Sequence, residues 1–235
     1  MNKYIMIGPP GAGKSTQAST LADAHGFVRI SVGDIFRWNI KNHTKLAAKI
    51  HRYIDSGQLV PDDIVEQVAK ARLEQHDWNY GFVMDGYPAS QAQAEFFLES
   101  YDVDGVILLE VPDNIIIERL SNFRVCKGCG LDYNLIYHRP KEDEVCEVCG
   151  GALIQRSTDT PDVIRDRIRD YHNKSEPVIE IFRRKELVVA IDGTKPSAEI
   201  YAVICAELAL SYGSNGSAFD SCTAMRCSAE WASRD

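Results

Sequence analysis

The 235-residue sequence lacks features that would place it in several classes of protein. No apolar run approaches the roughly 18 residues of a membrane-spanning helix, and the chain opens on a strand-like segment rather than a signal peptide. Positive charge is scarce: 26 Lys and Arg stand against 34 Asp and Glu, for a net charge of −8. This balance argues against nucleic-acid or membrane-surface partners. We therefore expect a cytoplasmic protein, in which any anion site must gather its few cations locally.

Cysteines are few and unevenly placed, seven in all, which argues against a disulfide-stapled scaffold. Four of them form two C-x-x-C pairs, Cys126/Cys129 and Cys146/Cys149, with 16 residues between the pairs. This spacing is typical of a tetrahedral zinc ribbon, and four thiolates leave no open position for catalysis. We therefore expect a structural Zn²⁺. Two reduced pairs with a redox role, or two disulfides, are the alternatives.

A glycine-rich segment, Gly8–Thr16, follows the apolar run Tyr4–Ile7 and fits the pattern G-x-x-x-x-G-K-[ST] in full. Its glycines let backbone N–H groups turn inward as an anion-binding nest at the start of a predicted helix, Lys14–His25. Lys14 is then suited to outer phosphates and Ser15 to Mg²⁺. A glycine-rich turn with a stray lysine is the alternative, and the strand and helix patterns on either side argue against it.

Short apolar runs alternate with helical patterns, which predicts an α/β fold whose parallel sheet is covered by helices on both faces. The predicted strands are Tyr4–Ile7, Phe27–Ser31, Phe82–Asp85, Val106–Val111 and Leu187–Ile191. Ligands should gather at the carboxyl ends of such strands, where Gly8, Asp85 and Asp192 fall. Asp85 is expected beside Mg²⁺, through water, although a strand-end aspartate can be merely a turn cap.

The segment Val32–Pro61 carries little strand character and predicts a small helical insertion. Its helices are expected at Gly33–Asn42 and Leu46–Ser56, with Gly57 as the C-cap. Other predicted features are a capping box at Ser90–Gln93, helices from Asp113 to about Asn122, Asp162–His172 (capped by Thr160) and Ser197–Ser211, and a hairpin around Asp132–His138. Residues 213–235 are rich in Ser, Gly, Asn and Ala, which predicts a flexible tail.

Together these motifs resemble the adenylate kinases of the long bacterial type, whose lid carries four zinc-binding cysteines. The resemblance covers about Lys3–Tyr212. It rests on Gly8–Thr16, Gly33–Arg37, Gly57–Val60, Asp85–Pro88, Gln93, Arg119, the four cysteines, Gln155–Arg156, Arg165–Arg167 and Asp192–Pro196. It implies a P-loop core with a five-stranded parallel sheet (residues 1–31, 62–122 and 160–212), a nucleoside-monophosphate-binding insertion (32–61), a zinc-binding lid (123–159) and the tail.

The resemblance also implies a function: reversible phosphoryl transfer from MgATP to a nucleoside monophosphate, with AMP favoured, by a monomer. Such a transfer needs positioning, charge neutralisation and exclusion of water rather than a protein nucleophile. The implied catalytic residues are Lys14, Asp85, Arg156 and Arg167. The implied ATP-binding residues are Gly11, Ala12, Gly13, Lys14, Ser15, Thr16, Arg119, Asp132, Tyr133 and Lys195. The implied AMP-binding residues are Val32, Arg37, Gln58, Leu59, Val60, Gly86, Gln93, Arg156 and Arg167. The implied metal ligands are Ser15 and Asp85 for Mg²⁺, and Cys126, Cys129, Cys146 and Cys149 for Zn²⁺.

The chain departs from the family pattern at four positions. Ala89 and Phe123 stand where the family has arginines, Val32 where it has a threonine, and Thr158 where it has an aspartate. These departures fall on the acceptor site and the lid, and the donor loop is intact. Two alternatives to an AMP kinase therefore remain: a kinase for a different nucleoside monophosphate, and a nucleotide-binding protein with weak or no catalysis.

Overall fold

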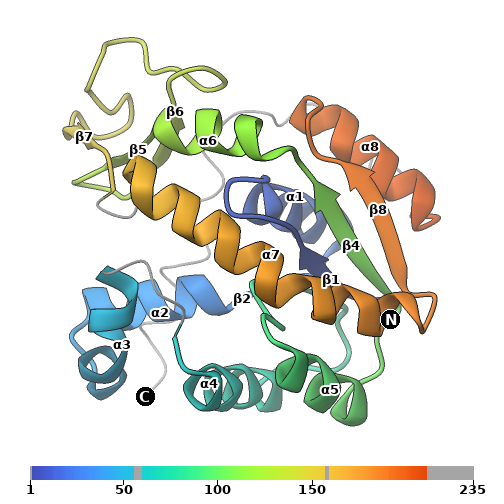
Figure 1. Cartoon of the computed structure of the whole chain (residues 1–235). Coiled ribbons are helices and arrows are strands. Elements are labelled where there is room, and N and C mark those ends of the chain that lie inside the picture. Colours follow the sequence, from blue (N-terminus) through green and yellow to red (C-terminus); the bar gives the residue numbers. More distant parts are fainter. Residues whose placement is uncertain (1, 56–59, 157–158, 211–235) are drawn as a thin grey trace.

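The computed structural model describes residues 2–55, 60–156 and 159–210 and contains the predicted parallel sheet (Figure 1). Its strands are β1 (Lys3–Ile7), β2 (Val28–Ser31), β3 (Phe82–Asp85), β4 (Gly105–Glu110) and β8 (Val188–Asp192). All neighbours are parallel, in the order β2-β3-β1-β4-β8. The five predicted strands are therefore confirmed, each to within about one residue at either end.

Helices cover both faces of this sheet. They are α1 (Lys14–His25), α2 (Val32–Lys41), α3 (Lys45–Asp55), α4 (Asp62–Glu74), α5 (Gln91–Ser100), α6 (Asp113–Ser121), α7 (Pro161–Arg183) and α8 (Ser197–Glu207). In Figure 1, α4, α5 and α7 lie in front of the sheet and α1 lies behind it. In the part of the chain that the structure describes, no helix is both long and apolar enough to cross a bilayer.

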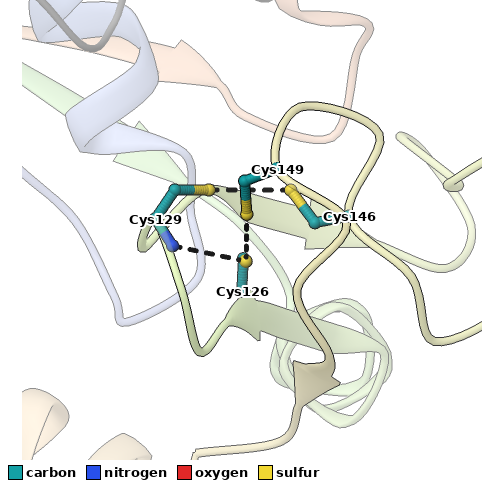
Figure 2. Close-up of side chains that lie close together, drawn as sticks. All are labelled: Cys126, Cys129, Cys146 and Cys149. Atoms are coloured by element: carbon teal, nitrogen blue, oxygen red, sulfur yellow. Dashed lines mark hydrogen bonds between the residues drawn. The ribbon is translucent and has the colours of Figure 1, made fainter.

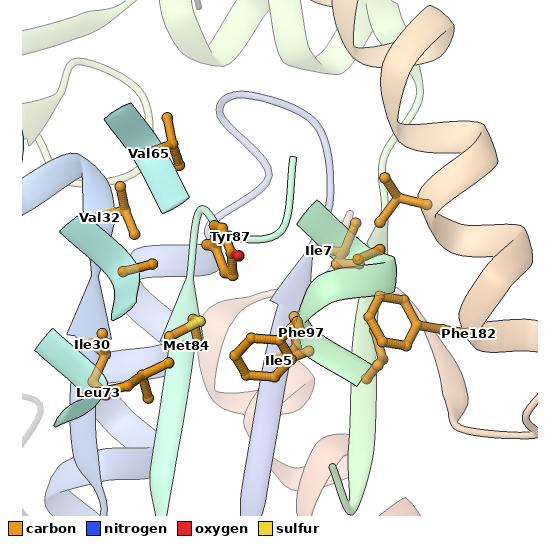
Figure 3. Packing of buried hydrophobic residues seen from close by; sticks show 14 of the residues in the cluster. Ile5, Ile7, Ile30, Val32, Val65, Leu73, Met84, Tyr87, Phe97 and Phe182 are labelled. Carbon is orange, nitrogen blue, oxygen red and sulfur yellow. The ribbon is translucent and has the colours of Figure 1, made fainter. Parts of the chain in front are cut away.

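Alternate side chains of the central strand β1 enter two different cores. Ile5 and Ile7 pack with α4, α5 and α7, whereas Tyr4 and Met6 pack with α1 and α8. Figure 3 shows the first core, where Ile5 and Phe97 lie between Met84 on one side and Phe182 on the other. Because β1 is buried on both faces, it reads as a continuous apolar run, as parallel strands do. The phosphate-loop candidate that follows β1 is thus anchored at the centre of the molecule.

Helix α7 is longer than the predicted Asp162–His172, because it continues past Pro177 to Arg183. Proline removes one backbone hydrogen bond and usually ends or kinks a helix. Here the turn after Pro177 buries Val178, Ile179 and Phe182, and this apolar contact stabilises the continuation. The last helix, α8, is in turn shorter than predicted and ends at Glu207, with Leu208 as its C-cap.

A second, smaller sheet contains the strands β5 (Phe123–Cys126), β6 (Asp132–Asn134) and β7 (Leu153–Ile154), in the antiparallel order β6-β5-β7. The prediction of a hairpin at Asp132–His138 was right only for the bridge between Asn134 and His138. The main partner of β6 is β5, which the sequence did not predict as a strand. Strands of two to four residues are too short to show an alternating pattern.

Helices α2 and α3 and the small sheet both lie on the left in Figure 1, beyond the core. They coincide with the segments that the sequence assigns to the acceptor-binding insertion and the lid. The small sheet has its own core of Cys126, Tyr133, Cys146 and Leu153. That the two segments move as separate bodies stays a prediction. Of the residues predicted above, Gly57, Gln58, Leu59, Thr158 and the tail lie outside the described residues.

Candidate active site

The loop after β1 approaches its neighbours closely, which explains its glycines. A Cβ atom on Gly8 would lie 2.8 Å from the carbonyl oxygen of Leu109 on β4. Gly13 precedes α1 with φ 92°, in the left-handed region that favours glycine. Lys14 is half-buried, and its Nζ donates to the carbonyl oxygens of Gly8 (2.8 Å) and Pro9 (2.7 Å). Burial lowers the pKa of Lys14 below 10.5, although Asp85 opposes this effect.

Ser15 and Asp85 meet at the carboxyl end of the sheet, as their positions in the sequence predict. The Ser15 hydroxyl donates to Oδ2 of Asp85 at 2.6 Å, and Asp85 is only 4% exposed. A hydroxyl and a carboxylate side by side are the hard oxygen donors that suit Mg²⁺. The residues present therefore fit a magnesium site.

On the acceptor side, Asp34 lies between two guanidinium groups. Nη2 of Arg29 is 2.7 Å from its Oδ2, and Arg37 donates to its Oδ1. Burial alone would raise the pKa of Asp34, but Arg37 and Arg29 outweigh it and the pKa is lowered. Nη2 of Arg29 also lies 3.5 Å from Oδ2 of Asp85. A continuous polar chain thus links Ser15 on the donor side to Arg37 on the acceptor side.

The two predicted catalytic arginines near the lid also face carboxylates. Nη2 of Arg156 lies 3.1 Å from Oδ1 of Asp132, and Nη1 of Arg167 lies 3.0 Å from Oδ1 of Asp159. Burial raises the pKa of Asp132, and the nearby charges of Arg156 and Arg37 oppose this shift. The charge of Arg167 in turn acts on Lys14. Lys14, Arg37, Arg156 and Arg167 therefore surround one region of the molecule.

The structure places the remaining donor-site candidates as follows. Nη2 of Arg119 lies 3.4 Å from the carbonyl oxygen of Thr194, and Lys195 is exposed beside it. Tyr133 is buried in the small sheet, where its hydroxyl contacts Sγ of Cys146 (3.4 Å) and accepts from the backbone N–H of Glu147 (3.0 Å). The Tyr133 side chain thus serves the cysteine cluster, and only its backbone is left for ATP.

The acceptor-site candidates that the structure describes are largely engaged with one another. Gln93 is 1% exposed; its Nε2 donates to Asp62 (2.6 Å) and its Oε1 accepts from the N–H of Ala89 (2.8 Å). Ser90 caps α5 by accepting from the N–H of Gln93 (3.4 Å), as the capping box predicts. Val32 and Val60 are buried, and Gly86 is exposed with φ 80°. Both ends of the Gln93 amide therefore already have partners within the protein.

Phe123 stands where the resemblance implies an arginine. Its ring lies 4.6 Å from the guanidinium of Arg156, so an aromatic contact occupies this position. Arg124, the next residue, donates to the carbonyl oxygens of Ser121 (3.0 Å) and Phe123 (2.8 Å). Arg124 is therefore anchored at the end of α6.

The four predicted zinc ligands form one cluster (Figure 2). All four Sγ atoms lie within 4.8 Å of one another. The closest pairs join one knuckle to the other: Cys126 to Cys149 at 3.3 Å and Cys129 to Cys146 at 3.6 Å. Zn–S bonds of about 2.3 Å in a tetrahedron place sulfurs about 3.8 Å apart, so the cluster fits Zn²⁺. These separations exceed a disulfide bond of about 2.05 Å, and the pairing between knuckles is not that of a redox C-x-x-C.

Sequence reasoning did not single out Arg29, although it contacts both Asp34 and Asp85. The signal that could have found it is a lone charge inside the apolar run Phe27–Ser31. A buried or half-buried charge in a strand needs a partner, and the parallel sheet supplies one at its carboxyl edge.

The site combines a strand–loop–helix unit that carries Lys14, an adjacent Ser15–Asp85 pair and arginines from three segments. This combination is typical of a P-loop nucleotide-binding phosphotransferase. The sequence profile of the adenylate kinase family matches residues 6–187. Adenylate kinases of Clostridium tetani and Caldicellulosiruptor saccharolyticus are 41% and 42% identical over 202 residues, which cover 84% of this chain and 94% of each relative. That of Archaeoglobus fulgidus is 42% identical over 196 residues, or 81% of this chain and 90% of the relative. The chain belongs to the adenylate kinase family of nucleoside monophosphate kinases.

Proposed function

We propose that the protein transfers the γ-phosphoryl group of MgATP reversibly to AMP and so interconverts ATP plus AMP with two ADP. The observation that carries this proposal is a run of neighbouring cations that starts beside the Ser15–Asp85 pair: Lys14 interacts with Asp85 and Arg167, and Arg156 interacts with Arg167 and Arg37. In a protein with a net charge of −8, so many cations at one place fit a site for two phosphate chains.

In the proposed reaction, an oxygen of the AMP phosphate bonds to the γ-phosphorus while the bond to the bridging β–γ oxygen breaks, leaving two ADP. The N–H groups of Gly11–Thr16 hold the donor phosphates, and Lys14 leaves the Gly8 and Pro9 carbonyls to bind them. Arg156 and Arg167 stabilise the transferring group, and Arg37 binds the acceptor phosphate. Each charged hydrogen bond of this kind is worth about 1.5–3 kcal/mol.

Two metals belong to the proposed function. Mg²⁺, when bound, neutralises charge on the phosphate oxygens; Ser15 and, through water, Asp85 would hold it. The four cysteines would hold a structural Zn²⁺, which stiffens residues 123–159 so that they close over the donor as one body. Closure of this lid, and of the acceptor-binding insertion at residues 32–61, would keep water away from the transferred group.

The bases would be bound at the two ends of the site. For the donor adenine we propose stacking on Arg119, with the backbone near Lys195 on its other side and Asp132 and the Tyr133 backbone nearby. For the acceptor base we propose Val32, Val60, Gly86 and Gln93, together with Gln58 and Leu59, which lie outside the described residues. A monomer acting in the cytoplasm stays a prediction.

Three observations favour a second candidate, either a kinase for a different nucleoside monophosphate or a nucleotide-binding protein with weak or no catalysis. Val32, buried at the start of α2, has no hydroxyl to offer an acceptor base, and Ala89 brings no cation to the acceptor phosphate. Phe123 likewise removes one cation from the lid. Each lost arginine–phosphate contact is worth about one to two powers of ten in rate.

A coupled assay of zinc-replete protein with MgATP and, in turn, AMP, CMP, UMP, GMP and dTMP tests these candidates. We expect the highest kcat/KM with AMP. A preference for another monophosphate would establish the different acceptor, and ATP binding without turnover of any acceptor would establish a nucleotide-binding protein. Ala89→Arg should raise kcat/KM for AMP, since it adds a cation beside the acceptor phosphate; an unchanged or lower value would contradict that role for position 89.

A further inference from the structure

Arg29 carries a charge inside the sheet. It lies in β2 between Val28 and Ile30, and the parallel register pairs it with Val83 and pairs Ser31 with Asp85. Since side chains alternate along a strand, Arg29 and Asp85 project from the same face. The Arg29 side chain is 26% exposed, and its buried Nε finds no hydrogen-bond partner among the residues described. Burying a charge and an unpaired N–H group costs folding free energy. A function of Arg29 is therefore expected among the groups that it contacts.

The two ion-pair partners of Arg29 belong to the two halves of the site. Its Nη2 lies 2.7 Å from Oδ2 of Asp34, which is next to the acceptor side, and 3.5 Å from Oδ2 of Asp85, which accepts from Ser15 on the donor side. The other oxygen of Asp34 binds Arg37. Asp34 is therefore shared by two guanidinium groups, one on the sheet and one on α2.

An acceptor phosphate would compete with Asp34 for the N–H donors of Arg37, since Nη2, which holds the carboxylate, supplies two of the five. Binding the phosphate would therefore weaken the contact between Arg37 and Asp34. A half-buried carboxylate left without a cation is unfavourable, and this cost would oppose acceptor binding. Arg29 removes the cost because it stays on Asp34 after Arg37 has left. The exchange matters more in this chain than in one with an arginine at position 89, because Ala89 supplies no second cation.

We propose that Arg29 is a positioning residue that holds Asp34 and thereby releases Arg37 to bind the phosphate of the acceptor nucleoside monophosphate. This inference rests on the proposed function for the presence of a monophosphate at Arg37. It assigns Arg29 to acceptor affinity and leaves donor affinity and the chemical step to other residues.

The test compares Arg29→Gln, Arg29→Lys, Asp34→Asn and the double variant in the full-length protein. AMP is titrated calorimetrically in the absence of ATP, and ATP in the absence of AMP. We expect Arg29→Gln to raise the Kd for AMP about tenfold, which corresponds to about 1.4 kcal/mol, with the Kd for ATP unchanged. Arg29→Lys should retain most of the wild-type affinity for AMP, because it keeps a cation beside Asp34. Arg184→Gln, which removes a surface pair with Glu180 on α7, is the matched control and should change neither Kd.

The double variant shows whether Arg29 acts through Asp34. With asparagine at position 34 there is no carboxylate to hold, so Arg29→Gln should then leave the Kd for AMP unchanged. A tenfold loss that persists in the Asp34→Asn background would mean that Arg29 touches the phosphate itself, and would overturn the proposal. An equal loss of ATP affinity, or no loss of AMP affinity, would also overturn it.

Binding and turnover separate this inference from the proposed function. If the wild type binds AMP but transfers no phosphoryl group, the proposed reaction fails while the Arg29 inference is still decided by the titrations. If the wild type prefers another monophosphate, the same titrations are made with that nucleotide. If it binds none, both proposals fail.

Discussion

At the scale of single residues, Arg156 contacts two different kinds of partner. Its guanidinium lies 4.6 Å from the Phe123 ring and 3.1 Å from Asp132. A cation over an aromatic face is stabilised by about 0.5–1 kcal/mol at exposed sites. We predict that Phe123→Leu lowers kcat about 2–5-fold, because Arg156 loses the aromatic ring on which its guanidinium stacks. Phe123→Tyr keeps the ring and should keep kcat near the wild-type value. Steady-state kinetics with MgATP and the preferred acceptor measure both. Equal effects of leucine and tyrosine would show that the ring does not position Arg156.

Lys14 gives a second prediction, on pH. Its pKa is lowered below 10.5 by burial, so its ammonium loses the proton at a lower pH in the folded than in the unfolded chain. Between these two pKa values the unfolded chain binds more protons, and the stability of the nucleotide-free protein should rise with pH through this window. ATP binding needs the ammonium, so its affinity should fall over the same window. Calorimetry and thermal unfolding between pH 7 and about pH 10.5 measure the two trends. After subtraction of the trends measured for Lys14→Met, the stability should rise with pH while the affinity for ATP falls. Trends in the same direction would contradict a phosphate-binding role for the Lys14 ammonium.

Residues at the ends of strands could be predicted from the sequence, whereas those in the middle could not. Ser15 and Asp85 follow recognisable patterns, and parallel strands bring their carboxyl ends to one edge, so their contact was expected. Arg29 follows no motif, and its partners depend on the register between β2 and β3. Gln93 was expected in a cap, but its bond to Asp62 joins two helices whose packing no local pattern encodes.

At the scale of elements, the cysteine cluster links a metal to the folding of the lid. The cluster core of four residues is too small to fold the small sheet alone. We predict about one equivalent of zinc per chain and, on removal of the metal or on Cys146→Ser, a lower melting temperature of the lid. Because the shift per kcal/mol grows as the unfolding unit becomes smaller, each kcal/mol lost should lower the melting temperature of the lid by more than the roughly 4–8 °C typical of a 60–100-residue domain. Metal analysis and thermal unfolding followed by hydrogen exchange of residues 123–156 measure these effects.

The matched control is Cys205→Ser, at a buried free cysteine on α8 outside the cluster. This variant should keep its zinc. A wild-type protein with no metal and four reactive thiols at the cluster would refute the zinc assignment, and loss of zinc from both variants would show that the assay reports folding rather than ligation.

Long elements with a regular pattern were predictable and short ones were not. The bounds of α1 were predicted to the residue, because a glycine-rich loop and Gly26 mark its two ends. The continuation of α7 beyond Pro177 depends on contacts that bury Val178 and Phe182 in the core. The strands of the small sheet are stabilised by pairing with one another and by the cysteine cluster. With two to four residues each, they are too short to show an alternating hydrophobic pattern in the sequence.

At the scale of the whole molecule, three segments far apart in the sequence bring opposite charges to one place. Asp34 and Arg37 come from α2, Asp132 from β6, and Arg156 and Asp159 from the segment between β7 and α7; Asp132 responds electrostatically to all four. Nucleotide phosphates would add negative charge to the same place. We therefore expect the carboxylates to act as partners for the arginines in the nucleotide-free protein, and the balance of charge to couple the three segments.

This coupling predicts that Asp132 holds the lid toward the insertion in the nucleotide-free protein. Asp132→Asn leaves the guanidinium groups of Arg37 and Arg156 with one carboxylate fewer between them, so the two segments should repel each other. We expect exchange of the lid amides (residues 123–156) to rise about 2–5-fold without nucleotide, the size of an ion-pair effect of up to about 1 kcal/mol. Asp143→Asn is the matched control, since Asp143 also pairs with an arginine at 3.1 Å but within the lid itself. With ATP and AMP bound in the absence of Mg²⁺, phosphates replace the lost charge, and both variants should be protected like the wild type. Equal exchange in the two nucleotide-free variants would show that the lid is held by its own packing and not by charge shared across the site.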